Sequence, residues 1–195
     1  MKFFLFFCFL NSFNDFLSNF KDYKFSSTKS FYCQDSNYKR VTSNYCHFFS
    51  FPLKSPNSEL IYGGKFTKNK FDYVIFEEYF PDGVGEHSPD GSFIYFGTVD
   101  KKNKKIVNIV KVAEDHLRES YNLIFFDSYI LVRKYKTSGP KIRFMDMPKN
   151  KALVTDFQVV FGDNGNLKLK KNNETKLVSY TYNENICNNG VFIVD

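Results

Sequence analysis

The chain has 195 residues, of which 43% are hydrophobic and 25% are charged, and its formal net charge is +6. This balance excludes a wholly disordered chain, because such chains lack the apolar residues that build a core. Aromatic residues make up 19% of the chain, as 25 Phe and 13 Tyr. Phe and Tyr favour strands, so the composition itself points toward β structure. The excess of Phe, Asn and Lys is typical of an A/T-rich genome.

The N-terminal segment, residues 1–20, has the outline of a signal peptide. Lys2 supplies a positive charge, an apolar run follows at residues 3–10, and polar residues come next. Either Ser12 or Ser18 would serve as the cleavage site, which predicts a secreted or lumenal protein. The alternative is a buried, Phe-rich extension of a cytoplasmic protein. No stretch reaches the roughly 18 apolar residues that cross a bilayer, so we expect no membrane span in the mature chain.

Residues 21–58 show no sustained hydrophobic period and are expected to be a poorly defined segment. They contain Cys33 and Cys46. In an oxidising compartment these two would form a local disulfide, which leaves Cys187 free or paired elsewhere, whereas in the cytoplasm all three would be reduced. His47 follows Cys46, but four ligands at the spacing of a zinc site are missing. The sequence therefore predicts neither a metal nor a cofactor.

Residues 59–195 are expected to form a β-rich domain of antiparallel hairpins. Four β-prone hairpins recur, at residues 60–76, 93–110, 129–146 and 177–195. Their irregular spacing of roughly 35–50 residues predicts an all-β fold of the incomplete or partial β-propeller type. The alternative is a β-sandwich or another antiparallel β domain.

Turn residues indicate where these strands connect. Residues 63–64, both Gly, and the Lys/Asn stretch after them are expected to join the first pair. Residues 100–105 are too polar to bury and would join the second pair. The run at residues 163–166, DNGN, predicts a tight turn between two further strands. The one helical turn that we expect lies at Val112–Ser120.

No catalytic constellation is found in the sequence. The histidines His47, His87 and His116 stand beside no evident nucleophile, and the chain has neither a G-x-S-x-G elbow nor a phosphate-binding glycine loop. Glu77 and Glu78 are adjacent, but in a strand they would point to opposite faces and could not cooperate. We therefore expect that the chain is not an enzyme, unless it is a fragment of a longer peptidase.

Lysines gather at the expected hairpin ends, at residues 68–70, 101–105 and 168–171. A nucleic-acid footprint would require them on one face together with exposed aromatic residues. We instead expect solvated turns and no nucleic-acid partner. Asn173 opens an Asn-Glu-Thr sequon and is a candidate glycosylation site.

The run at residues 87–96, HSPDGSFIYF, resembles the S-P-D-G-x-x-I-x-F pattern that opens propeller blades in the prolyl oligopeptidase family and in TolB-like proteins. Residues 129–133, 140–146 and 178–182 are similar in rhythm to later strands of that propeller. The resemblance covers residues 86–195 and implies a β-propeller. In the peptidase family the catalytic Ser, Asp and His lie in an α/β-hydrolase domain, and no position here matches them.

These observations favour a non-enzymatic, β-rich binding or interaction module that is secreted and has a protein partner. Two alternatives stay open. One is a propeller fragment of a serine peptidase of the prolyl oligopeptidase family that lacks its hydrolase domain. The other is a structural surface protein of a parasite or virus.

Overall fold

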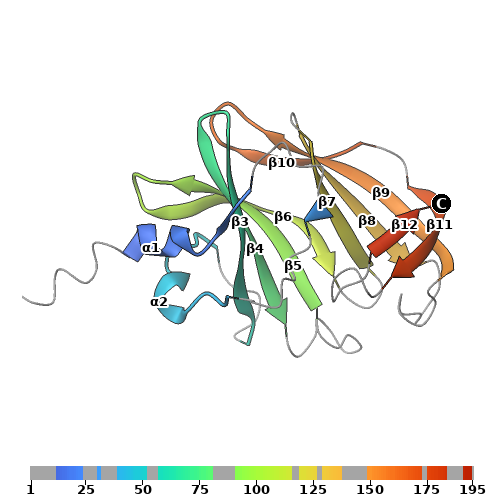
Figure 1. The fold of residues 1–195 in the computed structure, drawn as a ribbon. Coiled ribbons are helices and arrows are strands. Elements are labelled where there is room, and N and C mark those ends of the chain that lie inside the picture. The colour runs from blue at the N-terminus through green and yellow to red at the C-terminus, as the bar shows by residue number, and fades with distance from the viewer. Residues whose placement is uncertain are drawn as a thin grey trace, which may run out of the picture.

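The computed structural model describes residues 12–23, 30–31, 39–51, 57–80, 91–115, 119–126, 129–137, 149–172, 175–183 and 191–194. Most of these residues form strands that lie in two sheets, and the described helices are short. The all-β, antiparallel fold class that the sequence predicts is confirmed. Figure 1 shows the strands of the two sheets following one another across the molecule, with the N-terminal helices beside the first sheet.

The first sheet has five strands in the order β1-β3-β4-β5-β6. They are β1 (Lys21–Asp22), β3 (Glu59–Lys68), β4 (Phe71–Phe80), β5 (Gly91–Asp100) and β6 (Lys105–Asp115). Neighbours are antiparallel except for β1 and β3, which pair in parallel. Two long hairpins, β3–β4 and β5–β6, make up most of this sheet. Because Tyr73 pairs with Thr98, both hairpins bring their turns to the same end of the sheet.

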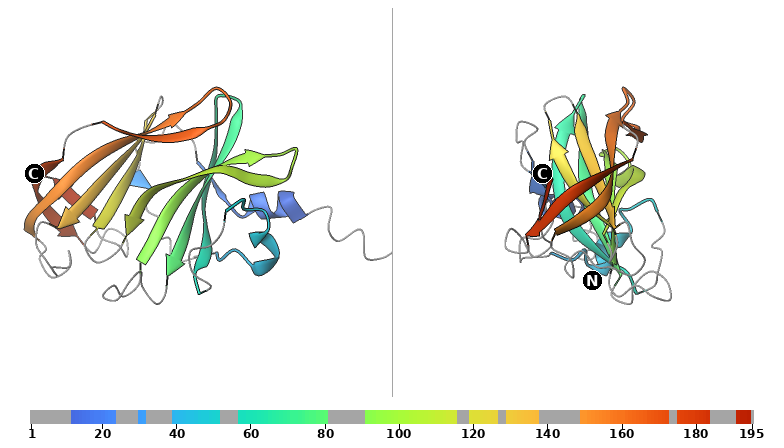
Figure 2. Two further views of the ribbon diagram at one scale, coloured as in Figure 1. Left: turned by 180° about the vertical axis from the view of Figure 1, so that it is seen from behind. Right: turned by 90° about the vertical axis from the view of Figure 1, so that its right-hand side faces the viewer.

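The second sheet has seven strands. They are β2 (Ser30–Phe31), β7 (Glu119–Phe125), β8 (Ile130–Thr137), β9 (Lys149–Phe161), β10 (Leu167–Lys171), β11 (Lys176–Asn183) and β12 (Val191–Val194). The long β9 has two partners along one edge, since β11 pairs with its first half and β10 with its second half. The β9–β10 hairpin thus reaches back over the first sheet, where β10 contacts β5 and β6 (Figure 2).

The first sheet is covered on both faces, which explains why nearly every residue of β4 and β5 is buried. Successive side chains of a strand point to opposite faces, so each face must find its own cover. One face packs on the second sheet through Phe66, Tyr73, Ile75, Ile94, Phe96, Leu123, Phe125, Ile130, Val132 and Val159. The other packs under the N-terminal segments through Phe13, Phe16, Phe20, Phe48, Phe49, Tyr62, Val74, Phe76, Phe93 and Tyr95.

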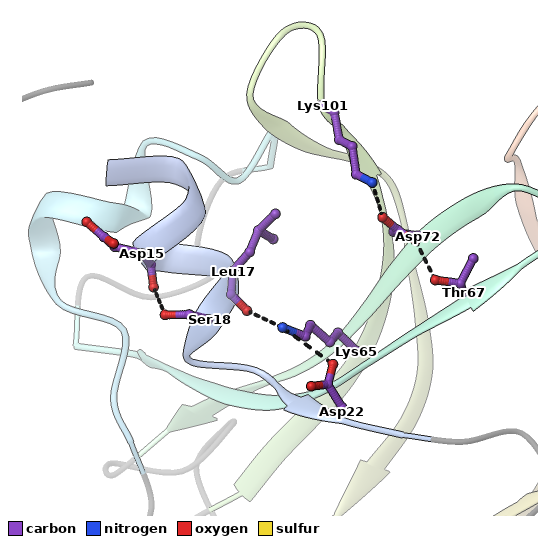
Figure 3. Close-up of polar contacts among 8 residues, drawn as sticks. All are labelled: Asp15, Leu17, Ser18, Asp22, Lys65, Thr67, Asp72 and Lys101. Carbon is purple, nitrogen blue, oxygen red and sulfur yellow. Dashed lines mark hydrogen bonds and ion pairs between the residues drawn. The ribbon is translucent and has the colours of Figure 1, made fainter. Parts of the chain in front are cut away.

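Two short helices, α1 (Ser12–Ser18) and α2 (Ser43–Cys46), belong to this N-terminal layer. The sequence predicts neither of them. Phe16 of α1 is fully buried, and its ring contacts those of six other aromatic residues of the layer and of β3. Lys65 of β3 connects the C-terminal end of α1 to the first sheet. Its Nζ lies 3.3 Å from the Leu17 carbonyl oxygen and 3.4 Å from Asp22 Oδ1 (Figure 3).

Four of the expected hairpins are confirmed in the pairing of strands, and the first of them is β3 paired with β4. β5 and β6 pair across residues 101–104, as the polar composition of that stretch predicts. β9 and β10 pair across the DNGN turn at residues 163–166. β11 and β12 pair as the fourth expected hairpin.

One local prediction is wrong, and a second is wrong in part. Val112–Ser120 is not a helical turn, because β6 continues to Asp115 and β7 starts at Glu119. Val112 and Ala113 are fully buried, and pairing of Ala113 with Ile94 of β5 overrides the local helical preference. Of the connection expected at residues 63–64 and the Lys/Asn stretch after them, only the stretch forms the turn, at residues 69–70, and residues 63–64 lie inside β3 at a shift of register.

The sharpest part of the propeller resemblance, residues 88–90, lies outside the described residues, as do residues 142–146 of the third hairpin. Among the described strands no sheet closes on itself. The propeller arrangement stays a prediction. Two sheets that share a hydrophobic cluster agree with the alternative of another antiparallel β fold.

Candidate functional site

A cleft of about 400 Å³ lies where the ends of three hairpins meet. It is lined by Lys70, Phe71, Asp72, Thr98, Val99, Asp100, Lys101, Val107, Asn108 and Asn164. These residues come from the β3–β4, β5–β6 and β9–β10 hairpins. Apolar side chains and charges of both signs therefore meet at one end of the first sheet.

The β3–β4 turn places a lysine at the rim of the cleft. Asn69 and Lys70 have φ angles of 49° and 71°, so both central residues of this two-residue turn are left-handed. Such a turn matches the twist of the flanking strands and is most often Asn-Gly. Lysine at the second position costs on the order of 1 kcal/mol relative to glycine, because its Cβ crowds the backbone.

The β9–β10 turn forms the opposite wall. Gly165 has a φ angle of 80°, and a Cβ at this position would come within 2.8 Å of the Phe71 ring. Glycine at position 165 thus allows the turn to pack directly against the Phe71 ring, which lines the cleft. Thr98 Oγ1 donates a 2.6 Å hydrogen bond to the Gly165 carbonyl oxygen and ties the turn to β5. Asn164 is consequently held above the first sheet.

Most charged groups at the cleft already have partners within the chain. Asp72 Oδ2 lies 2.5 Å from Lys101 Nζ, and Asp72 Oδ1 accepts a 2.5 Å hydrogen bond from Thr67 (Figure 3). Burial tends to raise the pKa of Asp72, but the hydrogen bonds from Lys101 and Thr67 outweigh it and hold the pKa below its ordinary value. Both carboxylate oxygens and the Lys101 ammonium are therefore engaged.

Asp100 is engaged in a similar way within its own turn. The backbone N–H of Asn103 donates to Asp100 Oδ1 at 3.0 Å, and its side-chain amide donates to Oδ2 at 2.7 Å. These donors stabilise the ionised carboxylate and lower the pKa of Asp100. Lys70 differs from these groups, since it forms no ion pair with any described residue.

The two adjacent glutamates of β4 form a second candidate site, and both are buried. Glu78 accepts 3.0 Å hydrogen bonds from Ser58 Oγ and Tyr95 Oη, on the face covered by the N-terminal layer. Glu77 lies on the other face, where burial raises its pKa and a hydrogen bond with Ser92 partly offsets the rise. Their opposite orientation is as the sequence predicts, so they form no carboxylate pair.

The Glu78 cluster is poorly suited to proton transfer. Burial and the neighbouring Glu78 carboxylate both raise the pKa of the Tyr95 phenol. A phenol of this kind stays protonated and donates its hydrogen bond, which makes it a structural partner of Glu78 rather than a base. Ser58 donates to the same carboxylate. We assign this cluster to the stability of the core.

The residues that the sequence singled out lie apart from the cleft. Cys46 ends α2, and its thiol lies 3.7 Å from the Thr42 carbonyl oxygen. Burial raises the pKa of this thiol, which lowers its reactivity. Cys33 lies outside the described residues, so the Cys33–Cys46 disulfide stays a prediction. Asn173 also lies outside them, and the neighbouring Asn172 is exposed.

Of the three histidines, His47 lies beside Phe48 in the N-terminal layer, and His87 and His116 fall outside the described residues. Within the described ranges no group of three or more His, Cys, Asp or Glu side chains is arranged to hold a metal ion. None of the helices that the structure describes has both the length and the apolar character to cross a membrane.

Comparison with known protein families, with curated proteins and with solved structures found no match. Function must therefore be argued from the geometry of the cleft itself.

Proposed function

We propose that this chain is a non-enzymatic protein-binding module, and that the cleft at the hairpin ends receives a segment of a partner polypeptide. The observation that carries the proposal is the mixed lining of the cleft. Phe71, Val99 and Val107 offer apolar contact, while Thr98 and Asn164 offer polar groups. Protein interfaces combine such an apolar centre with a polar rim.

The alternating charges favour a polypeptide over a nucleic acid. Two lysines and two aspartates line the cleft, so its surface is not uniformly positive. A phosphate backbone requires several cations along its path and would meet the carboxylates of Asp72 and Asp100 here. A polypeptide carries both signs of charge as well as backbone N–H groups that donate to carboxylates.

The proposal is tested by selecting displayed random peptides on the purified chain. We expect peptides that bind the wild-type chain and lose binding to Val107→Trp, whose indole would fill the cleft. Val160→Trp serves as the matched control, because Val160 is also a partly exposed valine but lies on β9 outside the cleft. Peptides that bind both variants equally, or a failure to select any, would contradict the proposal.

We further propose that the module acts in a secretory or extracellular compartment. This rests on the apolar run at residues 3–10 after Lys2 and on Cys33 and Cys46. Phe13 is part of the core, so we expect cleavage at or before Ser12, which keeps α1 in the mature chain. Non-reducing mass spectrometry of the native protein should show that N-terminus and a linked Cys33–Cys46 peptide. An intact Met1 with alkylatable thiols would contradict secretion.

A further inference from the structure

We infer that Lys70 is the specificity-determining cation of the cleft, and that it binds an acidic side chain flanked by apolar residues on the partner polypeptide. This inference rests on the proposed function and names the chemistry of its ligand. The first observation that supports it is which charged groups at the cleft already have a partner within the chain. Asp72 and Lys101 neutralise each other, and Asp100 is held by Asn103.

Lys70 is thereby the cation of the cleft that remains available to a ligand. It is exposed and lines the cleft, and it makes no ion pair with any described residue. A single available cation is complemented by a single anion. A carboxylate fits better than a phosphate group, because phosphate sites usually combine several cationic donors.

The backbone supplies the second support. Lys70 occupies a left-handed position of a two-residue turn, where glycine or asparagine would be less strained. This turn fixes the point at which the Lys70 side chain leaves the backbone. The side chain emerges next to Phe71, so an acidic residue bound there would have its apolar neighbours over that ring and over Val107.

The turn of the neighbouring hairpin offers a matched control. Lys104 also has a left-handed backbone, with a φ angle of 53°, and it is exposed. It does not line the cleft. Lys70→Gly and Lys104→Gly therefore remove the same charge from the same kind of backbone, and both should raise the midpoint of thermal unfolding. Only Lys70→Gly should change binding.

The experiment uses two displayed peptide libraries that differ at one fixed position, which is Glu in one and Gln in the other, with randomised apolar residues on both sides. We expect the wild-type chain to enrich the Glu library over the Gln library. The selected Glu peptides should bind Lys70→Gly about fivefold more weakly, the range of one exposed ion pair, and Lys104→Gly and Lys70→Arg nearly as well as wild type.

The outcomes separate this inference from the proposed function. Equal enrichment of the two libraries, with peptides that still lose binding to Val107→Trp, would leave the binding cleft in place and overturn the role of Lys70. Unchanged binding to Lys70→Gly would overturn it as well. Failure of both libraries to enrich would contradict the proposed function. Selective binding of a single-stranded oligonucleotide, lost in Lys70→Gly, would replace the acidic polypeptide with nucleic acid.

Discussion

The positive φ angle of Gly165 allows the β9–β10 turn to pack against Phe71, which lines the proposed binding cleft. We expect Gly165→Ala to destabilise the chain by roughly 1–3 kcal/mol, because alanine at a φ angle of 80° is strained and its Cβ would stand 2.8 Å from the Phe71 ring. Urea unfolding measures the difference. Gly162→Ala is the control, since its Cβ would come no closer than 3.2 Å to a flexible side chain. Equal effects of the two changes would contradict the account of the turn.

Glu77 makes the stability of the chain depend on pH. Burial raises its pKa in the folded state, so the folded chain holds this proton more tightly than the unfolded chain. Its stabilising effect is complete below the unfolded pKa of about 4.5 and declines as pH rises through the raised folded pKa. We expect Glu77→Gln to remove this decline and to be more stable than wild type above that window.

Thermal unfolding across pH compares the two chains, and Asp163→Asn is the control because Asp163 is an exposed carboxylate. The lowered pKa values of Asp72 and Asp100 make stability fall at acid pH in every variant, so they cancel in the comparison. Parallel pH profiles for wild type and Glu77→Gln would show that the Glu77 carboxyl is not the cause.

At the scale of elements, α1 contributes a buried side chain to the hydrophobic core. Phe16 is 0% exposed and packs with Phe20, Phe49 and Tyr62. We expect Phe16→Ala to lower the free energy of unfolding by about 3–5 kcal/mol, the range for loss of a buried phenylalanine ring. The exposed Asn14→Ala should change it by less than about 0.5 kcal/mol. A wild-type urea midpoint for Phe16→Ala would mean that α1 is not part of the core.

Some elements could be predicted from the sequence and others could not, for identifiable physical reasons. The DNGN turn at residues 163–166 was predicted correctly, since Asn and Gly are the residues that such turns require. The turn at Asn69 and Lys70 lacks glycine, so the prediction located it only within a longer connection that began at residues 63–64. Gly64 has another use there: a Cβ would collide with the Tyr23 ring at 2.3 Å.

The cleft is a property that no local pattern encodes. Thr98 and Gly165 are 67 residues apart in the chain, and their contact depends on the reach of β9. The sequence did place lysines at the hairpin ends, but it treated each end as a separate solvated turn. A prediction that the three hairpin ends meet requires the order of the strands in the two sheets, and hydrophobic periodicity does not supply that order.

At the scale of the whole molecule, the first sheet serves as the shared centre. The second sheet covers one of its faces and the N-terminal layer covers the other, so both faces of β4 and β5 are unavailable to a ligand. Among the described residues, the cleft opens at the end of the first sheet where the turns and the β9–β10 hairpin meet. This arrangement concentrates binding at loops on a rigid support, as is common for binding sites.

The most direct measurement of the central claim is a backbone NMR titration of the isotope-labelled chain with a peptide selected from the Glu library. We expect chemical-shift changes concentrated at Lys70, Phe71, Thr98, Val107 and Asn164, the residues that line the cleft. The changes should weaken in Lys70→Gly and disappear in Val107→Trp. Shift changes centred on the outer face of β8 and β9, with the cleft residues unmoved, would contradict the claim that the hairpin ends bind the partner.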